Sequence, residues 1–182
     1  LPENNSVDGR DLKCGNTDTH NCIVANNSCD RVKLWTGYSR VVNCLIYGTG
    51  DGVGGASPWA GIVIEDPTHP NSQFEIMNVT VADNLQREAY PMYVQYDSAN
   101  PISVLMRNTI ISGGYGPVYF SDSVNLTFDH NLIYRPSGGD VVQANGRGYT
   151  AAQLGELGAG NLSAQPWFVS PAWGSTGDYH LI

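Results

Sequence analysis

The stretch PVYFSD (residues 117–122) followed by VNLTFDHNLIY (124–134) decides the fold, because its pattern occurs three times in the chain. The two earlier copies are GIVIED (61–66) followed by QFEIMNVTVA (73–82), and YPMYVQYD (90–97) followed by ISVLMRNTIIS (102–112). Each copy contains three short runs of β-forming residues separated by turns. A repeated unit of this size predicts a solenoid, in which each coil of backbone stacks on the one before it.

One signature marks the same point of every coil: an Asn, one variable residue and then two mostly apolar β formers. It occurs at Asn21, Asn43, Asn78, Asn108 and Asn131. The spacings predict a coil of about 22 residues with insertions at one corner, where solenoids accept them. We expect the five amides to stack into a buried ladder at a tight bend, each bonded to the coils above and below.

Composition restricts the class of protein. The chain has 182 residues, of which 41% are hydrophobic and only 14% charged, and 21 are glycines. This length fits one domain, and the composition suits an all-β protein rich in turns. The net charge of −8 argues against a nucleic-acid partner, which needs a basic face. No apolar stretch approaches the length of a membrane span, so we expect no membrane insertion.

Four cysteines lie in the first quarter of the chain: Cys14, Cys22, Cys29 and Cys44. Four cysteines allow three disulfide pairings, and the sequence does not choose among them. The alternative is that these residues are buried free thiols, because Cys also serves as a small core residue. Disulfides would agree with an extracellular protein.

The end of the chain carries a family resemblance. GNLSAQPWFVSP (residues 160–171) and GDYHLI (177–182) resemble the closing segment of secreted bacterial β-helix repeat proteins, which belong to the pectate lyase-like superfamily. The resemblance implies a right-handed parallel β-helix of about five or six coils in residues 1–148. A short helix capped by Thr150 and a closing segment then fill residues 149–182 of the same domain.

The resemblance also bears on the ends of the chain and on its location. The family's closing segment continues beyond the point where this sequence stops, and the first coil has no obvious cap over its strand edges. We therefore expect the chain to be a piece of a longer protein, located outside the cell or on the cell surface. Further coils or neighbouring subunits are then candidate partners.

Three aspartates follow the first strand of successive copies: Asp66, Asp97 and Asp122. In a register of stacked coils their carboxylates meet near one corner, where hard oxygen ligands suit Ca²⁺. Pectate lyase-like β-helices bind calcium in a similar way, so calcium is the one candidate cofactor. The alternative is that these residues form turns through Asx hydrogen bonds, which stacked coils would repeat.

A candidate catalytic group lies in the third copy. FDHN (residues 128–131) resembles a short segment common in pectate lyases, and Arg107 lies one coil earlier. Arg107 and His130 each precede a signature Asn, so we expect them to be outward neighbours, and with Asp129 they offer the best acid–base set in the chain. The alternative is a surface pair without a catalytic role.

Tyrosines gather in the repeats, and Tyr93, Tyr96, Tyr119 and Tyr134 are the candidate substrate-binding residues. Outward tyrosine rings offer flat apolar area with a polar tip, which suits a sugar ring. The alternative is that Tyr is simply favoured in strands.

Three functions follow from this sequence. The first is a module that recognises polysaccharide without catalysis of its own, favoured by the low charge, the tyrosines and the incomplete catalytic set. The second is a fragment of a polysaccharide lyase, hydrolase or epimerase. The third is a structural stalk or filament segment whose coils stack end to end. Fold alone does not choose among them.

Overall fold

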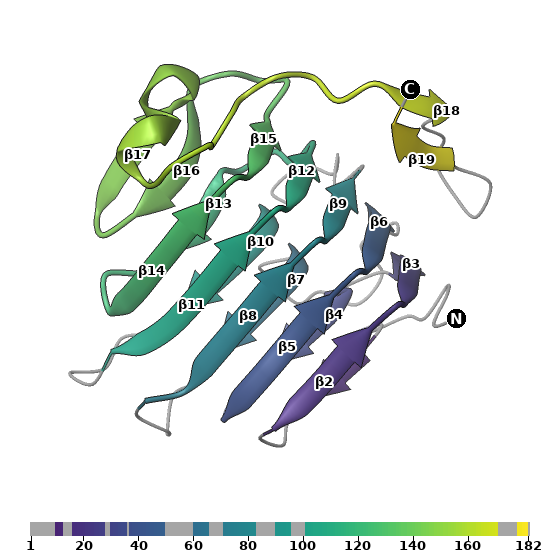
Figure 1. The fold of residues 1–182 in the computed structure, drawn as a ribbon, viewed down its shortest axis with the longest axis vertical. Helices are drawn as coiled ribbons and strands as arrows, with labels where there is room; N and C mark the ends of the chain where they lie inside the picture. Colours follow the sequence, from purple (N-terminus) through teal and green to yellow (C-terminus); the bar gives the residue numbers. More distant parts are fainter. Residues whose placement is uncertain are drawn as a thin grey trace.

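The structure is a computed structural model that describes residues 10–12, 16–27, 30–35, 37–49, 60–65, 71–82, 90–95, 101–170 and 178–181. Every third strand along the chain joins the same sheet, so the coiled chain forms three parallel sheets (Figure 1). The predicted all-β fold, a parallel β-helix of about five coils with one short helix, is confirmed.

The three sheets form the faces of the coil. Sheet 1 contains β1 (Arg10–Leu12), β4 (Val32–Leu34), β7 (Ala60–Glu65), β10 (Tyr90–Gln95), β13 (Val118–Phe120), β16 (Asp140–Ala144) and the antiparallel β17 (Arg147–Thr150). Sheet 2 contains β2 (Thr17–His20), β5 (Tyr38–Val42), β8 (Gln73–Met77), β11 (Ile102–Arg107) and β14 (Val124–Asp129). Sheet 3 contains β3 (Ile23–Asn27), β6 (Leu45–Thr49), β9 (Thr80–Ala82), β12 (Ile110–Ser112) and β15 (Leu132–Tyr134).

The core consists of columns of apolar side chains that repeat from coil to coil. Alternate residues of a strand point to opposite faces of its sheet, so one set from every strand points inward. In sheet 3 the inward column is Val24, Ile46, Val81, Ile111 and Ile133, all buried. Burial of such β-branched side chains contributes roughly 1.5–3 kcal/mol each relative to exposure, which favours the stacked register.

A bend in left-handed backbone conformation separates sheet 2 from sheet 3 in every coil. Asn21, Asn43, Asn78 and Asn108 occupy it with φ of 52° to 54°. In the last coil and in the capping segment, the equivalent positions are occupied by His130, with φ of 55°, and Gly160, with φ of 68°. Asn and Gly tolerate this conformation better than other residues, which explains why the signature repeats.

The predicted ladder is therefore wrong in two respects. The bend asparagines are exposed rather than buried, because their side chains point away from the core. Asn131 does not belong with them: Asn108 N donates to Asp129 O, which aligns Asn108 with His130 instead.

Asn131 belongs to the next column, which is the one that points inward. Its members are Cys22, Cys44, Val79, Thr109, Asn131 and Asn161. Only the end of this column is an amide ladder. Asn131 Oδ1 accepts from Thr109 N at 3.0 Å, and Asn131 Nδ2 donates to Met106 O at 3.1 Å. Asn161 Oδ1 accepts from Asn131 N at 3.0 Å.

The C-terminal end of the coil is capped. After β16 the chain turns back into β17 and then forms the 3₁₀ helix η1 (Ala151–Glu156), which buries Leu154 against the core. Thr150 is the N-cap as predicted, and its N–H donates to Gln153 Oε1 at 3.1 Å. Gly158 then crosses β14 so closely that a Cβ there would lie 2.1 Å from Phe128 O.

The chain next runs back along sheet 3 toward the N-terminal coils (Figure 1). Leu162 bridges Leu132 of β15, and the hairpin of β18 (Phe168–Ser170) and β19 (Asp178–Leu181) lies beyond it. Tyr179 of this hairpin packs on Tyr47 of β6, with ring centroids 4.7 Å apart. The hairpin thereby buries outward residues of sheet 3, including Ala25 and Ala82.

No helix in the described ranges is both long and apolar enough to cross a membrane.

Candidate functional site

Two predicted tyrosines meet on the outer face of sheet 1. Tyr93 of β10 and Tyr119 of β13 are register partners on neighbouring coils. Their rings stack with centroids 4.9 Å apart and planes at 16°. This geometry follows from the fold, because equivalent side chains of a parallel β-helix recur at the strand spacing of about 4.8 Å. Both rings are half-buried, so part of each faces solvent.

Tyr90, which is not among the predicted substrate-binding residues, joins this pair. Its ring lies 5.1 Å from that of Tyr93 and 6.3 Å from that of Tyr119. Tyr90 also packs tightly on Gly116, where a Cβ would lie 2.6 Å from its ring. We refer to Tyr90, Tyr93 and Tyr119 as the tyrosine cluster.

Of the other two predicted tyrosines, Tyr134 does not join the cluster. Tyr134 ends β15 and therefore lies on sheet 3, in register with Ser112. The repeats place it in the third run of its copy, whereas Tyr93 and Tyr119 lie in the first run, but the sequence does not say which run faces a ligand. Tyr96 lies outside the described residues.

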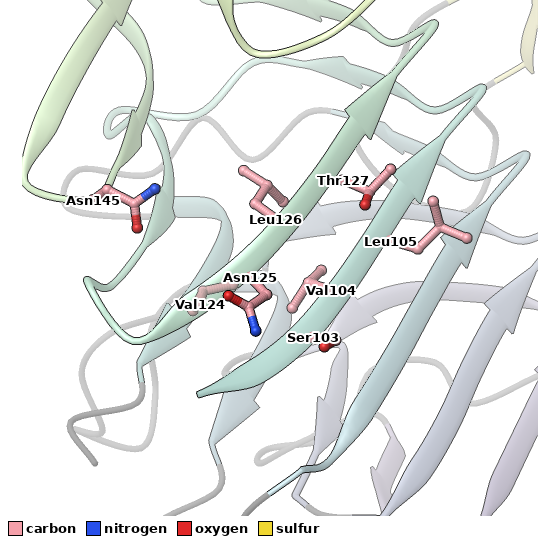
Figure 2. A pocket seen from close by; sticks show the side chains of 8 residues that line it. All are labelled: Ser103, Val104, Leu105, Val124, Asn125, Leu126, Thr127 and Asn145. Carbon is pink, nitrogen blue, oxygen red and sulfur yellow. The ribbon is translucent and has the colours of Figure 1, made fainter. Parts of the chain in front are cut away.

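A hollow of about 380 Å³ opens beside β11 and β14 at the C-terminal end of sheet 2 (Figure 2). Its polar lining residues are Ser103, Asn125, Thr127 and Asn145, and all four are exposed. Its apolar lining residues are Val104, Leu105, Val124 and Leu126. The hollow thus combines neutral hydrogen-bonding groups with an apolar surface and has no charged lining residue. We refer to it as the polar hollow.

The polar hollow exists because β14 is the edge strand of sheet 2. The capping segment covers only the end of this strand, where Asn161 Nδ2 donates to Phe128 O at 2.7 Å. The beginning of the strand, with Val124 and Leu126, lines the hollow. Sequence reasoning missed this site, since no motif marks the last strand of a sheet.

The tyrosine cluster and the polar hollow lie on consecutive faces of the same coils. β13 carries Tyr119 and ends at Phe120, and the chain turns through residues 121–123 into β14, which lines the hollow. Asn145 comes from the corresponding corner of the next coil, directly after β16. A long ligand could therefore contact both features by passing over one corner.

The predicted calcium ligands are only partly described. Asp122 lies exposed at the corner between β13 and β14, and a Cβ on Gly146 would lie 3.5 Å from its Oδ1. Asp66 and Asp97 lie outside the described residues. Among the residues that the structure does describe, no three His, Cys, Asp or Glu side chains gather closely enough to hold a metal ion.

Arg107 and Asp129 lie together on the outer face of sheet 2, and His130 lies at the bend after β14, so the arrangement differs from the predicted one. Arg107 is the register partner of Asp129, not of His130, and Arg107 Nη2 lies 2.9 Å from Asp129 Oδ2. His130 occupies the bend one residue later, with its ring against Gly160. The predicted alignment of Arg107 with His130 is therefore off by one residue, because His130 takes the place of a bend asparagine and aligns with Asn108.

A second hollow, of about 290 Å³, lies near the N-terminal end of sheet 2 and was not predicted. It is lined by Asp18, His20, Asn21, Arg40, Val42 and Asn43. Arg40 sits between two acids, 3.6 Å from Asp18 Oδ2 and 3.0 Å from Glu75 Oε2. Glu75 also accepts a hydrogen bond from the Tyr38 hydroxyl, which raises the pKa of Tyr38. The arginine of this hollow is therefore already paired with carboxylates of the protein.

Two of the four cysteines are described. Cys22 and Cys44 are free thiols that follow the bend in neighbouring coils, while Cys14 and Cys29 lie outside the described residues.

Comparison of the chain with models of protein families, with curated proteins and with solved structures found no match in any of the three. The case for a function therefore depends on the geometry of the tyrosine cluster and the polar hollow.

Proposed function

We propose that the protein is an extracellular or cell-surface β-helix module that recognises a neutral polysaccharide and has no catalysis of its own. The observation that carries the proposal is the stacked pair of Tyr93 and Tyr119, half-buried on the outer face of sheet 1. Tyrosine rings bind sugars well because the apolar face of a sugar packs on the ring while the phenol offers a hydrogen bond.

The polar hollow supplies the second part of the proposed interaction. Asn and Ser side chains both donate and accept hydrogen bonds, which matches the hydroxyl groups of a sugar. Ser103, Asn125 and Asn145 provide three such groups over an apolar surface. Ligand sites typically combine apolar area with a few placed polar groups in this way. A linear polymer has the length to reach from this hollow to the tyrosine cluster.

The charges favour a neutral ligand. The chain carries a net charge of −8, which repels acidic polysaccharides. The described cations near the two features are already engaged. Lys33, on the same face as the tyrosines, lies 3.6 Å from Asp30 and 3.5 Å from Glu65. A polyuronate would therefore find no unpaired positive group in the polar hollow.

The enzymatic alternative has weaker support. In the resembling lyases an Arg or Lys acts as the base, and such a role requires a group that is free to accept a proton. Arg107 is instead held in an ion pair with Asp129. The stalk alternative also has weaker support, because the antiparallel β17 occupies the edge of sheet 1 on which a further coil would stack.

An array of neutral and acidic glycans, combined with an absorbance assay for unsaturated sugar products, tests the proposal. We expect binding to one class of neutral glycan and no product from any glycan. Release of unsaturated products from a polyuronate would replace the proposal with the lyase alternative. Absence of binding to every glycan would refute recognition.

A further inference from the structure

Cys22 and Cys44 are stacked on one another in neighbouring coils. Leu45 N donates to Cys22 O at 2.9 Å, and Ile23 is the register partner of Leu45. Directly before the bend, His20 is the register partner of Val42. The two cysteines therefore occupy the same place in consecutive coils, the first two positions of the inward column that ends with Asn131 and Asn161.

Each thiol makes the same local hydrogen bond, to the carbonyl two residues earlier in its own coil. Cys22 Sγ donates to His20 O at 3.2 Å, and Cys44 Sγ donates to Val42 O at 3.3 Å. Burial raises the pKa of the Cys44 thiol, and the nearby Cys22 sulfur adds to the rise through its charge and a hydrogen bond. Cys44 Sγ also lies 3.6 Å from Thr19 O, which belongs to the coil that carries Cys22.

We propose that Cys22 and Cys44 form a disulfide that joins the first two described coils when the protein meets a disulfide oxidant. Neighbouring strands lie about 4.8 Å apart, and disulfides join Cα atoms roughly 4.4–6.8 Å apart. The stacked register therefore brings the two residues within bonding range without a rearrangement of the fold. An oxidising extracellular location, which forms part of the proposed function, would supply such an oxidant.

The two thiols have different roles in this reaction. Cys22 is half-buried and Cys44 is only 4% exposed, so an oxidant in solution reaches Cys22 first. The Cys22 thiolate attacks the oxidant's disulfide, forms a mixed disulfide and releases one thiolate. The Cys44 thiolate then attacks the Cys22 sulfur and displaces the second thiolate. Two protons leave the protein, two electrons pass to the oxidant, and the oxidant becomes two thiols.

The Cys22–Cys44 disulfide would stabilise the N-terminal end of the inward column, which has no amide side chains. At its C-terminal end the column is held by hydrogen bonds between Asn131 and Asn161, whereas Val79 offers none. A covalent link from Cys22 to Cys44 would close a loop that contains β3, β4 and β5. Closing a loop of this length removes freedom from the unfolded chain and raises its free energy relative to the folded state.

The test isolates this pair from the other cysteines. A variant with Cys14→Ser and Cys29→Ser retains only Cys22 and Cys44, and a matched control carries Cys22→Ser in addition. Each folded variant is incubated with oxidised glutathione, and free thiols are counted after denaturation. We expect the first variant to lose both thiols, to fall in mass by two hydrogens and to remain monomeric. Its Tm should rise by about 5 °C or more.

The control variant retains only the buried Cys44, so it should keep that thiol, form no intramolecular bond and show no such rise in Tm. If the first variant keeps both thiols or stops at the mixed disulfide, the proposal is refuted. Fragment-ion mapping of the unreduced four-cysteine chain gives a second test that needs no variant. Linkage of Cys22 to Cys44 supports the proposal, and linkage of either residue to Cys14 or Cys29 overturns it.

Discussion

Asn131 Nδ2 donates a hydrogen bond to Asn161 Oδ1 across a distance of 3.2 Å, which joins the last full coil to the segment that caps it. Both side chains are buried, at 1% and 9% exposure. Because a buried amide that loses a partner leaves other polar groups without hydrogen bonds, this pair makes the cap part of the cooperative fold.

Replacement of Asn161 by Ala should destabilise the protein by about 2–4 kcal/mol. Asn161 Nδ2 donates to Phe128 O at 2.7 Å and to Gly158 O at 2.9 Å, and these carbonyls would lose their partner inside the protein. Urea unfolding measures the effect. Asn125→Ala, at an exposed site on β14, is the control and should change stability by less than about 0.5 kcal/mol. Equal losses for the two variants would contradict the ladder.

The backbone conformation of the bend predicts which substitutions at Asn108 destabilise the protein most. Its φ of 52° is left-handed, so Asn108→Ala should cost about 1 kcal/mol, whereas Asn108→Gly should be close to neutral. The side chain itself is exposed, so lost packing contributes little to either value. Thermal unfolding of the two variants checks the order. A glycine variant that is less stable than the alanine variant would show that the amide, rather than the backbone, matters here.

Two glycines near the cap should respond in opposite ways to an added methyl group. A Cβ on Gly158 would lie 2.1 Å from Phe128 O, so Gly158→Ala must displace the cap from β14 and should cost about 1–3 kcal/mol. A Cβ on Gly155 would meet nothing within 4 Å. Gly155→Ala should therefore be neutral or stabilising by up to about 1 kcal/mol. Denaturant midpoints for the pair give the answer, and a harmless Gly158→Ala would mean that the cap lies elsewhere.

The C-terminal hairpin should detach locally when its anchor is removed. Tyr179 is 7% exposed and packs against Tyr47 and Phe168, at centroid distances of 4.7 Å and 5.3 Å. Tyr179→Ala should accelerate amide exchange in β18 and β19 by more than about tenfold and leave the core of sheet 3 protected. Leu181→Ala, at a position that is 56% exposed, is the control and should leave exchange unchanged. Unchanged protection of the hairpin in Tyr179→Ala would contradict the observed docking.

The coil could be predicted from the sequence because every coil needs a residue that tolerates the left-handed bend. Only a few residue types tolerate this conformation, so Asn recurs there in a recognisable pattern, at Asn21, Asn43, Asn78 and Asn108. The register failed at a single point, where DHN offers two candidates for the bend. His130 occupies the bend, and Asn131 points into the core. It belongs to the same inward column as Val79 and Thr109, but these three residue types differ so much that the sequence does not show the column.

The candidate site was less predictable, because it depends on where the stack ends and on which sheet each strand joins. Tyr93 and Tyr119 could be paired from the repeats, since both lie at the same place in the first strand of a copy. Tyr134 lies after the predicted bend, in the third run of its copy, but the sequence does not say which of the three faces binds a ligand. The polar hollow has no motif, because it arises from the uncovered edge of β14 rather than from any residue pattern.

The most direct measurement of the central claim is affinity electrophoresis in the neutral polysaccharide that the array identifies, with Tyr93→Ala, Tyr119→Ala and Tyr134→Ala compared with the unaltered protein. Tyr134 is the matched control, since it is also a half-buried strand tyrosine but lies on sheet 3. We predict that each substitution in the stacked pair weakens binding by at least about tenfold and that Tyr134→Ala leaves it unchanged. Full binding by the first two variants, with their folds intact, would contradict the account.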